Sequence, residues 1–251
     1  MVIRVTFLGS SGAFNGAGRA HSCYWIEDEL GTYAVDFGPT ALMQCRRFGK
    51  DPSDLDAIYV THLHGDHLGG APILLIDQQF NNRRDRPLYI GGPPGIVGRM
   101  TKLREGTYPS VVQRGLTYPL TYRQWDIPGE TELLGRKVRA IRAKHDRNNM
   151  ASSLRIEVGG RVLVFSGDTG WQPELGRLTE GADLFITECT GVDEEYWGHL
   201  SVDDIIAHRH ELLAKRVVLS HLSDASRRVA TAKAASMNVE VADDGLVIEI
   251  P

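Results

Sequence analysis

The sequence is poor in cysteine. Its 251 residues include three, Cys23, Cys45 and Cys189, and they are far apart along the chain. An odd and scattered set does not predict a disulfide framework. It is typical of a protein kept in a reducing compartment, so we expect a cytoplasmic location.

Long hydrophobic runs are also missing. No stretch approaches the roughly 20 apolar residues of a membrane-spanning helix. The first eight residues have no basic segment ahead of an apolar core, so they predict a β-strand rather than a signal peptide. We therefore expect no association with a membrane.

Positive charge is not in excess. Lysine and arginine number 28 against 32 acidic residues, which gives a formal charge of −4. Non-specific binding of nucleic acid requires many phosphate contacts from basic side chains. The balance does not favour a large RNA partner, although it leaves room for a local basic patch.

Apolar segments of strand and helix length alternate along the whole chain, with no linker or low-complexity stretch. A hydrophobic content of 42% suffices for a sizeable core, and we expect one domain over residues 1–251. The expected strands are 3–8, 22–27, 32–36, 57–60, 87–90, 138–143, 153–158, 162–166, 184–187, 217–220 and 246–250. The expected helices are 40–48, 71–80, 95–104, 202–213 and 227–235.

This order suits two sheets packed face to face with helices outside, but periodicity alone leaves a doubly wound sheet as an alternative. The segment 107–128 gives no clear pattern. Its aromatic residues fit either a pocket wall or the core, and they are Tyr108, Tyr118, Tyr122 and Trp125.

Three imidazoles and one carboxylate fall within six residues of one another. They are His62, His64, Asp66 and His67, directly after an apolar strand and just before Gly69. His62 and His64 point the same way if the chain is still extended there. Imidazole and carboxylate donors suit zinc, manganese or iron, so this segment predicts a metal site rather than a solvated loop.

The spacing His-x-His-x-Asp-His after a strand resembles the signature of the metallo-β-lactamase superfamily. The resemblance extends over nearly the whole chain and implies an α/β fold, a four-layer αββα sandwich. It implies further ligands at the ends of later strands, which are His145, Asp168 and His221. It also implies that Asp36, at the end of strand 32–36, accepts a hydrogen bond from a ligating imidazole.

The resemblance implies two divalent ions, zinc first, with manganese or iron as alternatives. One ion would be held by His62, His64 and His145, and the other by Asp66, His67 and His221. Asp168 and a hydroxide would bridge them, and Asp66 would also orient that hydroxide.

Four segments resemble ribonuclease Z and related small phosphodiesterases: 8–13, 19–24, 87–95, and 187–190 together with 198–201. In this resemblance His199, outside the metal set, stabilises the phosphate and protonates the leaving oxygen, while Glu188 orients it. The alternative is that His199 only helps to cap the helix 202–213.

Ribonuclease Z has a long arm that grips tRNA between the third and fourth motifs, and here only residues 146–167 separate them. We therefore predict a binuclear metal-dependent hydrolase, a phosphodiesterase that uses a metal-bridging hydroxide. Its expected substrate is a small phosphodiester such as a cyclic nucleotide, a cyclic ribose phosphate or a short oligonucleotide. The alternatives are a lactone, thioester or β-lactam hydrolase and a ribonuclease Z-type tRNA 3′ endonuclease, and a homodimer stays open.

Overall fold

The computed structural model describes residues 2–147, 150–193 and 197–251. Within these ranges the strands form two sheets of seven strands each. In spatial order, the first sheet contains β14 (Val247–Ile250), β1 (Ile3–Gly9), β2 (Cys23–Asp28), β3 (Gly31–Val35), β4 (Leu55–Tyr59), β5 (Leu88–Gly92) and β6 (Leu120–Gln124). The second contains β13 (Glu240–Val241), β12 (Arg216–Ser220), β11 (Leu184–Glu188), β10 (Arg161–Phe165), β9 (Ser152–Val158), β8 (Arg136–Arg142) and β7 (Gly129–Leu133).

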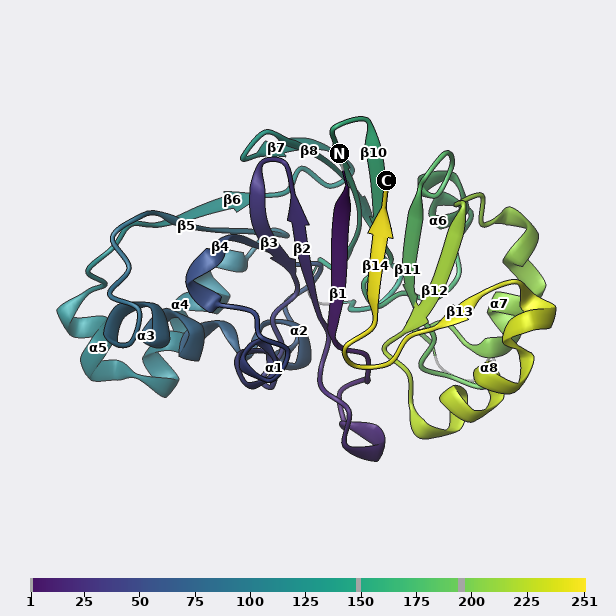
Figure 1. The fold of residues 1–251 in the computed structure, drawn as a ribbon, viewed down its shortest axis with the longest axis horizontal. Helices are drawn as coiled ribbons and strands as arrows, with labels where there is room; N and C mark the ends of the chain where they lie inside the picture. Colours follow the sequence, from purple (N-terminus) through teal and green to yellow (C-terminus); the bar gives the residue numbers. More distant parts are fainter. Residues whose placement is uncertain (1, 148–149, 194–196) are drawn as a thin grey trace.

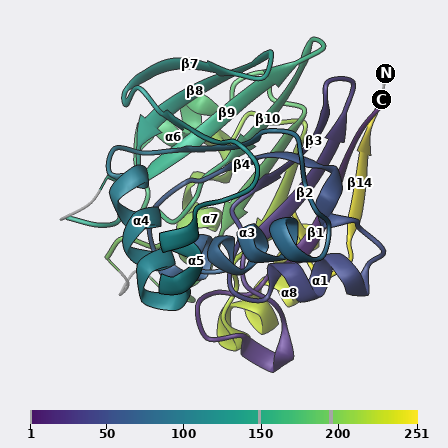
Figure 2. The same ribbon diagram turned by 90° about the vertical axis from the view of Figure 1, so that its left-hand side faces the viewer.

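Helices flank the two sheets on opposite sides (Figures 1 and 2). Those beside the first sheet are α1 (Ala41–Arg47), α2 (Gly65–Leu68), α3 (Ala71–Phe80), α4 (Ile96–Thr107) and α5 (Pro109–Arg114). Those beside the second sheet are α6 (Pro173–Leu178), α7 (Val202–His208) and α8 (Asp224–Met237).

Three separate apolar cores lie between the layers. One contains buried side chains of both sheets, the second joins the first sheet to its helices, and the third joins the second sheet to its helices. Strand β4 shows how the sequence produces this arrangement: Ala57 and Tyr59 belong to the core between the sheets, whereas Ile58 belongs to the helix-side core. A strand that is covered on both faces carries apolar side chains on both of them. The predicted four-layer αββα sandwich is confirmed.

The direction of the strands decides where functional side chains gather. Strands β10, β11 and β12 are parallel to one another, and β8 runs the same way because it is antiparallel to β9, which is antiparallel to β10. Their carboxyl ends therefore meet at one edge of the second sheet. In open α/β sheets this edge is the usual place for a ligand.

Several helix limits differ from those expected. Helix α7 ends at His208 rather than residue 213, because the chain tightens into a 3₁₀ turn at Arg209–Glu211, a common ending for a helix. Helix α8 begins three residues earlier than expected because Ser223 caps it, accepting a hydrogen bond from the backbone N–H of Ser226. Helix α6 and strand β13 were not anticipated, since both are too short to show a period.

Of the four aromatic residues in the unassigned segment 107–128, Tyr118 and Trp125 are buried in the core, whereas Tyr108 and Tyr122 are partly exposed. The segment forms helix α5 and strand β6, which pairs in parallel with β5. The Tyr118 hydroxyl donates to the Leu75 carbonyl at 3.1 Å, and the indole N–H of Trp125 donates to the Val60 carbonyl at 2.9 Å. These bonds fasten the chain just before β6 to helix α3 and the residue after β6 to the end of β4, which does not suit a mobile lid.

All three cysteines are buried free thiols, as expected from their spacing. None of the helices in the described ranges combines the length and apolar character needed to cross a bilayer.

Candidate metal centre and its pocket

The first group of site residues follows β4. The chain stays extended through His64 and then turns into the single-turn helix α2, which carries Asp66 and His67. His62 and His67 are 1% and 2% exposed, so both imidazoles are enclosed by protein. Enclosure by protein fixes the orientation of both rings.

The second group comes from the second sheet. His145 follows β8, Asp168 follows β10 and His221 follows β12, at the edge where these strands all end. His221 has φ of 50°, a left-handed backbone conformation that is uncommon outside glycine. Asp36, after β3, has φ of 57°. Such conformations cluster at functional sites because the surrounding structure has to hold them there.

The structure brings all seven predicted ligands together. His62, His64 and His145 form one group of potential ligand atoms, and Asp66, His67, Asp168 and His221 form another; within each group these atoms lie within 4.8 Å of one another. Asp168 reaches both groups. Its Oδ2 lies 3.7 Å from His62 Nε2 and 3.5 Å from His221 Nε2, while its Oδ1 lies 3.3 Å from His67 Nε2.

Three buried polar atoms in this cluster have no hydrogen-bond partner: His62 Nε2, His67 Nε2 and Asp168 Oδ1. Leaving such an atom unsatisfied costs about 1–3 kcal/mol. Proteins rarely tolerate several of them side by side. Nitrogen and carboxylate lone pairs that converge without donors fit a divalent cation, so the residues present suit the metal ions that the superfamily implies.

The outer nitrogens of these rings are held by neighbouring groups. His67 Nδ1 lies 2.7 Å from Asp36 Oδ2, the position in which the sequence placed Asp36. Asp36 also accepts from the backbone N–H of Thr61 at 2.8 Å. His145 Nδ1 donates to the Gly198 carbonyl at 2.7 Å. Each contact fixes the ring so that Nε2 points into the cluster.

The pKa directions in the metal-free cluster follow from burial and neighbouring charge. Burial would lower the pKa of His67, but the carboxylates of Asp168 and Asp36 outweigh it and hold that pKa well above its usual range. Burial would raise the pKa of Asp168, but the imidazoles of His221, His67 and His62 hold it well below its usual range. Without a metal the carboxylates therefore attract protons onto nearby rings.

His199 lies beside the metal cluster and is paired with Glu188. Its Nδ1 is 2.9 Å from Glu188 Oε1 and 3.9 Å from Asp168 Oδ2. Burial lowers the pKa of His199, but the charge and hydrogen bond of Glu188 outweigh burial and raise it to about 9. Divalent cations bound nearby would reduce that value. Helix α7 is capped by Ser201, so His199 is not needed as a cap.

Glu188 is buried and fixed by three further contacts. It accepts hydrogen bonds from the backbone N–H groups of Thr169 and Thr190, at 2.9 and 3.1 Å, and from the Thr190 hydroxyl at 2.6 Å. Thr190 Oγ1 also lies 2.9 Å from His221 Nδ1. Thr190 thus joins the His199 pair to the metal cluster, a role that its place in the sequence did not reveal.

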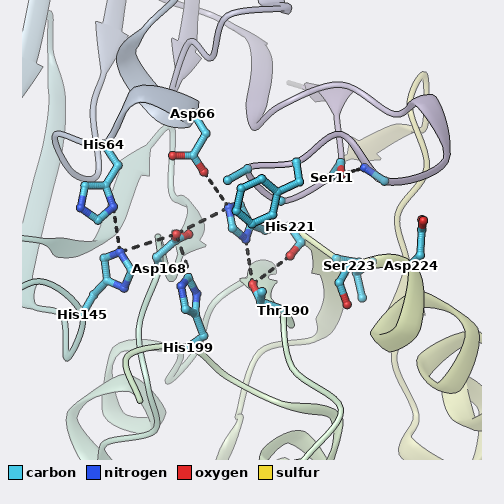
Figure 3. Close-up of a pocket in the computed structure, with 15 residues that line it drawn as sticks. Ser11, His64, Asp66, His145, Asp168, Thr190, His199, His221, Ser223 and Asp224 are labelled. Carbon is cyan, nitrogen blue, oxygen red and sulfur yellow. Dashed lines mark hydrogen bonds and ion pairs between the residues drawn. The ribbon is translucent and has the colours of Figure 1, made fainter. Parts of the chain in front are cut away.

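The cluster opens into a pocket of about 390 Å³. In Figure 3, His64 and His145 lie on one side of it, Ser223 and Asp224 on the other, and Asp168 and His221 between them. The loop after β1 completes the wall with Ser11, Gly12, Ala13, Phe14 and Gly16. Part of this loop lies in segment 8–13, which resembles ribonuclease Z, but none of its residues was predicted to line a pocket.

Residues 32–222 match the family described as the beta-lactamase superfamily domain. The chain belongs to the beta-lactamase superfamily. Among curated relatives, ribonuclease Z of Methanothermobacter thermautotrophicus is 26% identical across 99% of this chain and 97% of the relative. Ribonuclease Z of Halobacterium salinarum is 27% identical across 100% of this chain and 98% of the relative.

Solved structures of the same superfamily fold superpose over almost the whole chain. The metallo-beta-lactamase fold protein YhfI from Bacillus subtilis gives a TM-score of 0.82 at 23% identity, covering 100% of both chains. The short form of human tRNase Z gives 0.76 at 23% identity, covering 99% of both. A diphosphatase from the PhnP family gives 0.76 at 16% identity, covering 99% of this chain and 98% of its own. At these identities the likeness shows the fold.

The superfamily was predicted from the sequence, and the family match confirms it. The curated relatives carry the name ribonuclease Z, the branch that the sequence resembles. The alignment with the Methanothermobacter relative spans 302 positions against 251 residues here, so the relative contains inserted residues that this superfamily member lacks.

Proposed function

We propose that this chain is a binuclear metal-dependent phosphodiesterase acting on a small phosphodiester. The observation that carries the proposal is the His199–Glu188 pair beside a cluster of seven potential ligands, with His199 lining the same pocket as the cluster. The names of the curated relatives agree with the enzyme class predicted from the sequence, a metal-dependent hydrolase acting on phosphodiesters.

His62, His64 and His145 would hold one ion, and Asp66, His67 and His221 the other, with Asp168 shared between them. Zinc is our first choice for both, with manganese or iron as alternatives, because the donors are imidazole and carboxylate. When bound, the ions supply Lewis acidity toward a phosphoryl oxygen and make water a nucleophile at neutral pH.

His199 would act on the leaving group. As an imidazolium it donates a hydrogen bond to a phosphoryl oxygen and then a proton to the departing oxygen. Glu188 positions the ring, because its carboxylate accepts from Nδ1 and leaves Nε2 as the donating atom. The same pair favours phosphate over carbonyl substrates, since a lactone or β-lactam has less need of such an acid.

Asp66 would orient the attacking water. It lines the pocket, and its Oδ2 lies 3.2 Å from His221 Nε2 and 3.4 Å from His67 Nε2. Burial would raise the pKa of Asp66, but the neighbouring imidazoles of His221 and His67 hold it well below its usual range. The carboxylate therefore stays ionised and accepts a hydrogen bond from the nucleophile.

The size of the pocket supports a small substrate. A volume of about 390 Å³ is at the lower end of the range for small-molecule sites. Strands β9 and β10 and their turn take up much of the segment between His145 and Asp168. The net charge of −4 also disfavours a large RNA.

A tRNA 3′ endonuclease is the second candidate. It is favoured by the curated relatives, which carry the name ribonuclease Z and align over nearly their whole length.

The buried free cysteines support placing either enzyme in the reducing cytoplasm.

The deciding experiment is a substrate screen with zinc- or manganese-loaded protein. The panel contains 2′,3′-cyclic nucleotides, a cyclic ribose phosphate, precursor tRNA, a chromogenic lactone and nitrocefin, with Asp168→Asn as the inactive control. Turnover of the small phosphodiesters above the others supports the proposal. Faster cleavage of precursor tRNA selects the second candidate, and turnover of the lactone or nitrocefin alone removes both.

A further inference from the structure

Phe14 is 98% exposed, although it lines the pocket. Burying a phenylalanine side chain is worth about 1.5–3 kcal/mol, so a ring left wholly in water at the mouth of a site is a costly placement. The other exposed aromatic residues in the described part of the chain, Phe80 and Trp197, do not line this pocket. Phe14 therefore needs a reason tied to what the pocket holds.

The loop that carries Phe14 is fastened on both sides of the ring. On one side, the Ala13 carbonyl lies 3.2 Å from His21 Nε2. On the other, the Asn15 side-chain amide donates to the Arg19 carbonyl at 2.8 Å, and the backbone N–H of Gly16 donates to Ser11 Oγ at 2.9 Å. These bonds hold the loop in place at the wall of the pocket, where Phe14 is one of the lining residues.

The backbone of the loop is also held away from its relaxed conformations. Asn15 has φ of 52° and Ala17 has φ of 49°, both in the left-handed region. For alanine this region is unfavourable, and it persists where the surroundings enforce it. An ordinary exposed turn does not require a left-handed backbone at two of three consecutive residues.

Asp224 lies on the same rim, at the start of helix α8. A Cβ built on Gly16 would come within 2.6 Å of Asp224 Oδ1, so the loop and the helix start are in contact. In the part of the chain that the structure describes, the Asp224 carboxylate accepts no hydrogen bond. The charges of Arg19 and Arg227 act on this carboxylate, but both guanidinium groups hydrogen-bond elsewhere, so its oxygens remain available as acceptors.

We infer that Phe14 and Asp224 form a binding surface for the nucleobase of the substrate. This inference rests on the proposed phosphodiesterase function and names its substrate class, a nucleoside phosphodiester. An aromatic face suits a flat ring, and a carboxylate accepts hydrogen bonds from ring and amino N–H groups. A second phosphate or a sugar phosphate would be repelled by Asp224 and would gain little from Phe14.

The positions of these residues agree with a phosphate site at one side of the pocket and a nucleobase surface at the other. Asp224 and Ser223 lie on the side opposite His64 and His145 (Figure 3). A phosphate held near His199 and the metal ligands would direct its nucleoside across the pocket toward the loop. The volume of about 390 Å³ leaves room for a single nucleotide rather than a longer chain.

The first test measures binding by calorimetry, using metal-loaded protein with AMP and with ribose 5-phosphate. We expect AMP to bind more tightly than ribose 5-phosphate. Phe14→Ala should lower the affinity for AMP by about 5- to 150-fold, the range for loss of one stacked base. It should leave the affinity for ribose 5-phosphate unchanged. Phe14→Trp should retain AMP binding.

Phe80→Ala is the matched control, because it removes another exposed phenylalanine at the far end of helix α3. It should leave the affinities for both ligands unchanged. Equal affinity of AMP and ribose 5-phosphate for the wild type, or equal weakening of both by Phe14→Ala, would overturn the inference.

The second test assigns Asp224. CMP and UMP differ in the exocyclic group at C4, an amine in one and a carbonyl in the other. A carboxylate should favour CMP, and Asp224→Asn should narrow the ratio of the two affinities, because an amide can donate as well as accept. A ratio that is the same in both proteins would remove Asp224 from the surface.

Binding and turnover fail separately. If AMP binding depends on Phe14 but no phosphodiester is cleaved, the proposed function is wrong and the nucleobase surface stands. If cyclic nucleotides are cleaved and Phe14→Ala changes neither binding nor kcat/KM, the function stands and the surface is wrong.

Discussion

Two imidazoles of the cluster, His67 and His221, are buried among carboxylates, and this decides how the site exchanges protons for metal. Burial lowers the pKa of His221, but Asp168 and Asp66 outweigh burial and raise it. The pKa of His67 is raised in the same way, by the carboxylates of Asp168 and Asp36. Both shifts favour the protonated ring when no metal is bound.

Ligation requires neutral imidazole, so metal uptake should release protons from these rings. The sign follows from the raised pKa values: the apparent affinity should rise as pH rises and level off once both rings are neutral in the free protein. Calorimetric titration of zinc into metal-free protein in two buffers of different ionisation enthalpy measures the release. Identical heats in both buffers would contradict it.

The ligand assignment makes a second prediction for single residues. His62→Ala and Asp168→Ala should lose metal and activity together, because each removes a donor that no neighbour can replace. Elemental analysis of purified protein measures the metal content. His210→Ala is the control, since that side chain is 76% exposed and outside the cluster. Full metal content in both site variants would disprove the assignment.

The role proposed for His199 separates from that of the ligands. His199→Ala should keep its metals but lower kcat by roughly 100-fold or more on a phosphodiester with a poor leaving group, the usual scale of acid catalysis. The loss should be much smaller with a p-nitrophenyl ester, whose leaving oxygen needs no proton. Glu188→Gln should give an intermediate loss. A uniform effect on both substrates would argue against proton donation.

Among the structural elements, a buried ion pair fastens the second sheet to the first. Arg136 at the start of β8 binds Asp28 at the end of β2 through two hydrogen bonds, at 2.8 and 2.6 Å, and neither side chain is exposed. The guanidinium also lies 4.5 Å from the centre of the Tyr33 ring. The pair therefore joins β2 of the first sheet to β8 of the second sheet. His145 follows the other end of β8.

Asp28→Ala should reduce the free energy of unfolding by about 3–5 kcal/mol, because it leaves a guanidinium buried without its partner. Urea denaturation measures the change. Glu130→Gln breaks the exposed pair with Lys137, whose side chains are both about half exposed, and should leave stability unchanged. Equal effects of the two substitutions would mean that burial does not set the strength of the Asp28 pair.

At the scale of the whole molecule, the proposed ligands come from both sheets. His62, His64, Asp66 and His67 follow a strand of the first sheet, and His145, Asp168 and His221 follow strands of the second. Metal ions bound by this set would cross-link the two halves of the sandwich.

Removing the metals with a chelator should therefore lower the melting temperature of the protein. A ligand present at 1,000 times its dissociation constant stabilises the folded state by about 4 kcal/mol. Differential scanning calorimetry before and after dialysis against chelator measures the shift, and adding zinc back should restore it. A melting temperature that does not respond to metal would mean that the cluster holds none.

Sequence patterns predicted the structure well where a single segment contains the whole pattern. The apolar strands, the turn after β4 and the motif at 61–67 could each be predicted without knowledge of the fold. Short elements such as α6 and β13 could not, because six or two residues do not establish a period. The cap at Ser223 was overlooked, which moved the start of α8.

The sequence by itself determined the alternation of strands and helices and the donors of the motif at 61–67, because hydrophobic period and donor chemistry are local properties. The more distant ligands His145, Asp168 and His221 were predicted from the family resemblance. Only the tertiary structure decided that Thr190 joins Glu188 to His221, that Trp125 is a core residue, and that Phe14 and Asp224 share one rim. These are relations between segments far apart in the chain. They depend on the direction and packing of the strands, which no single segment encodes.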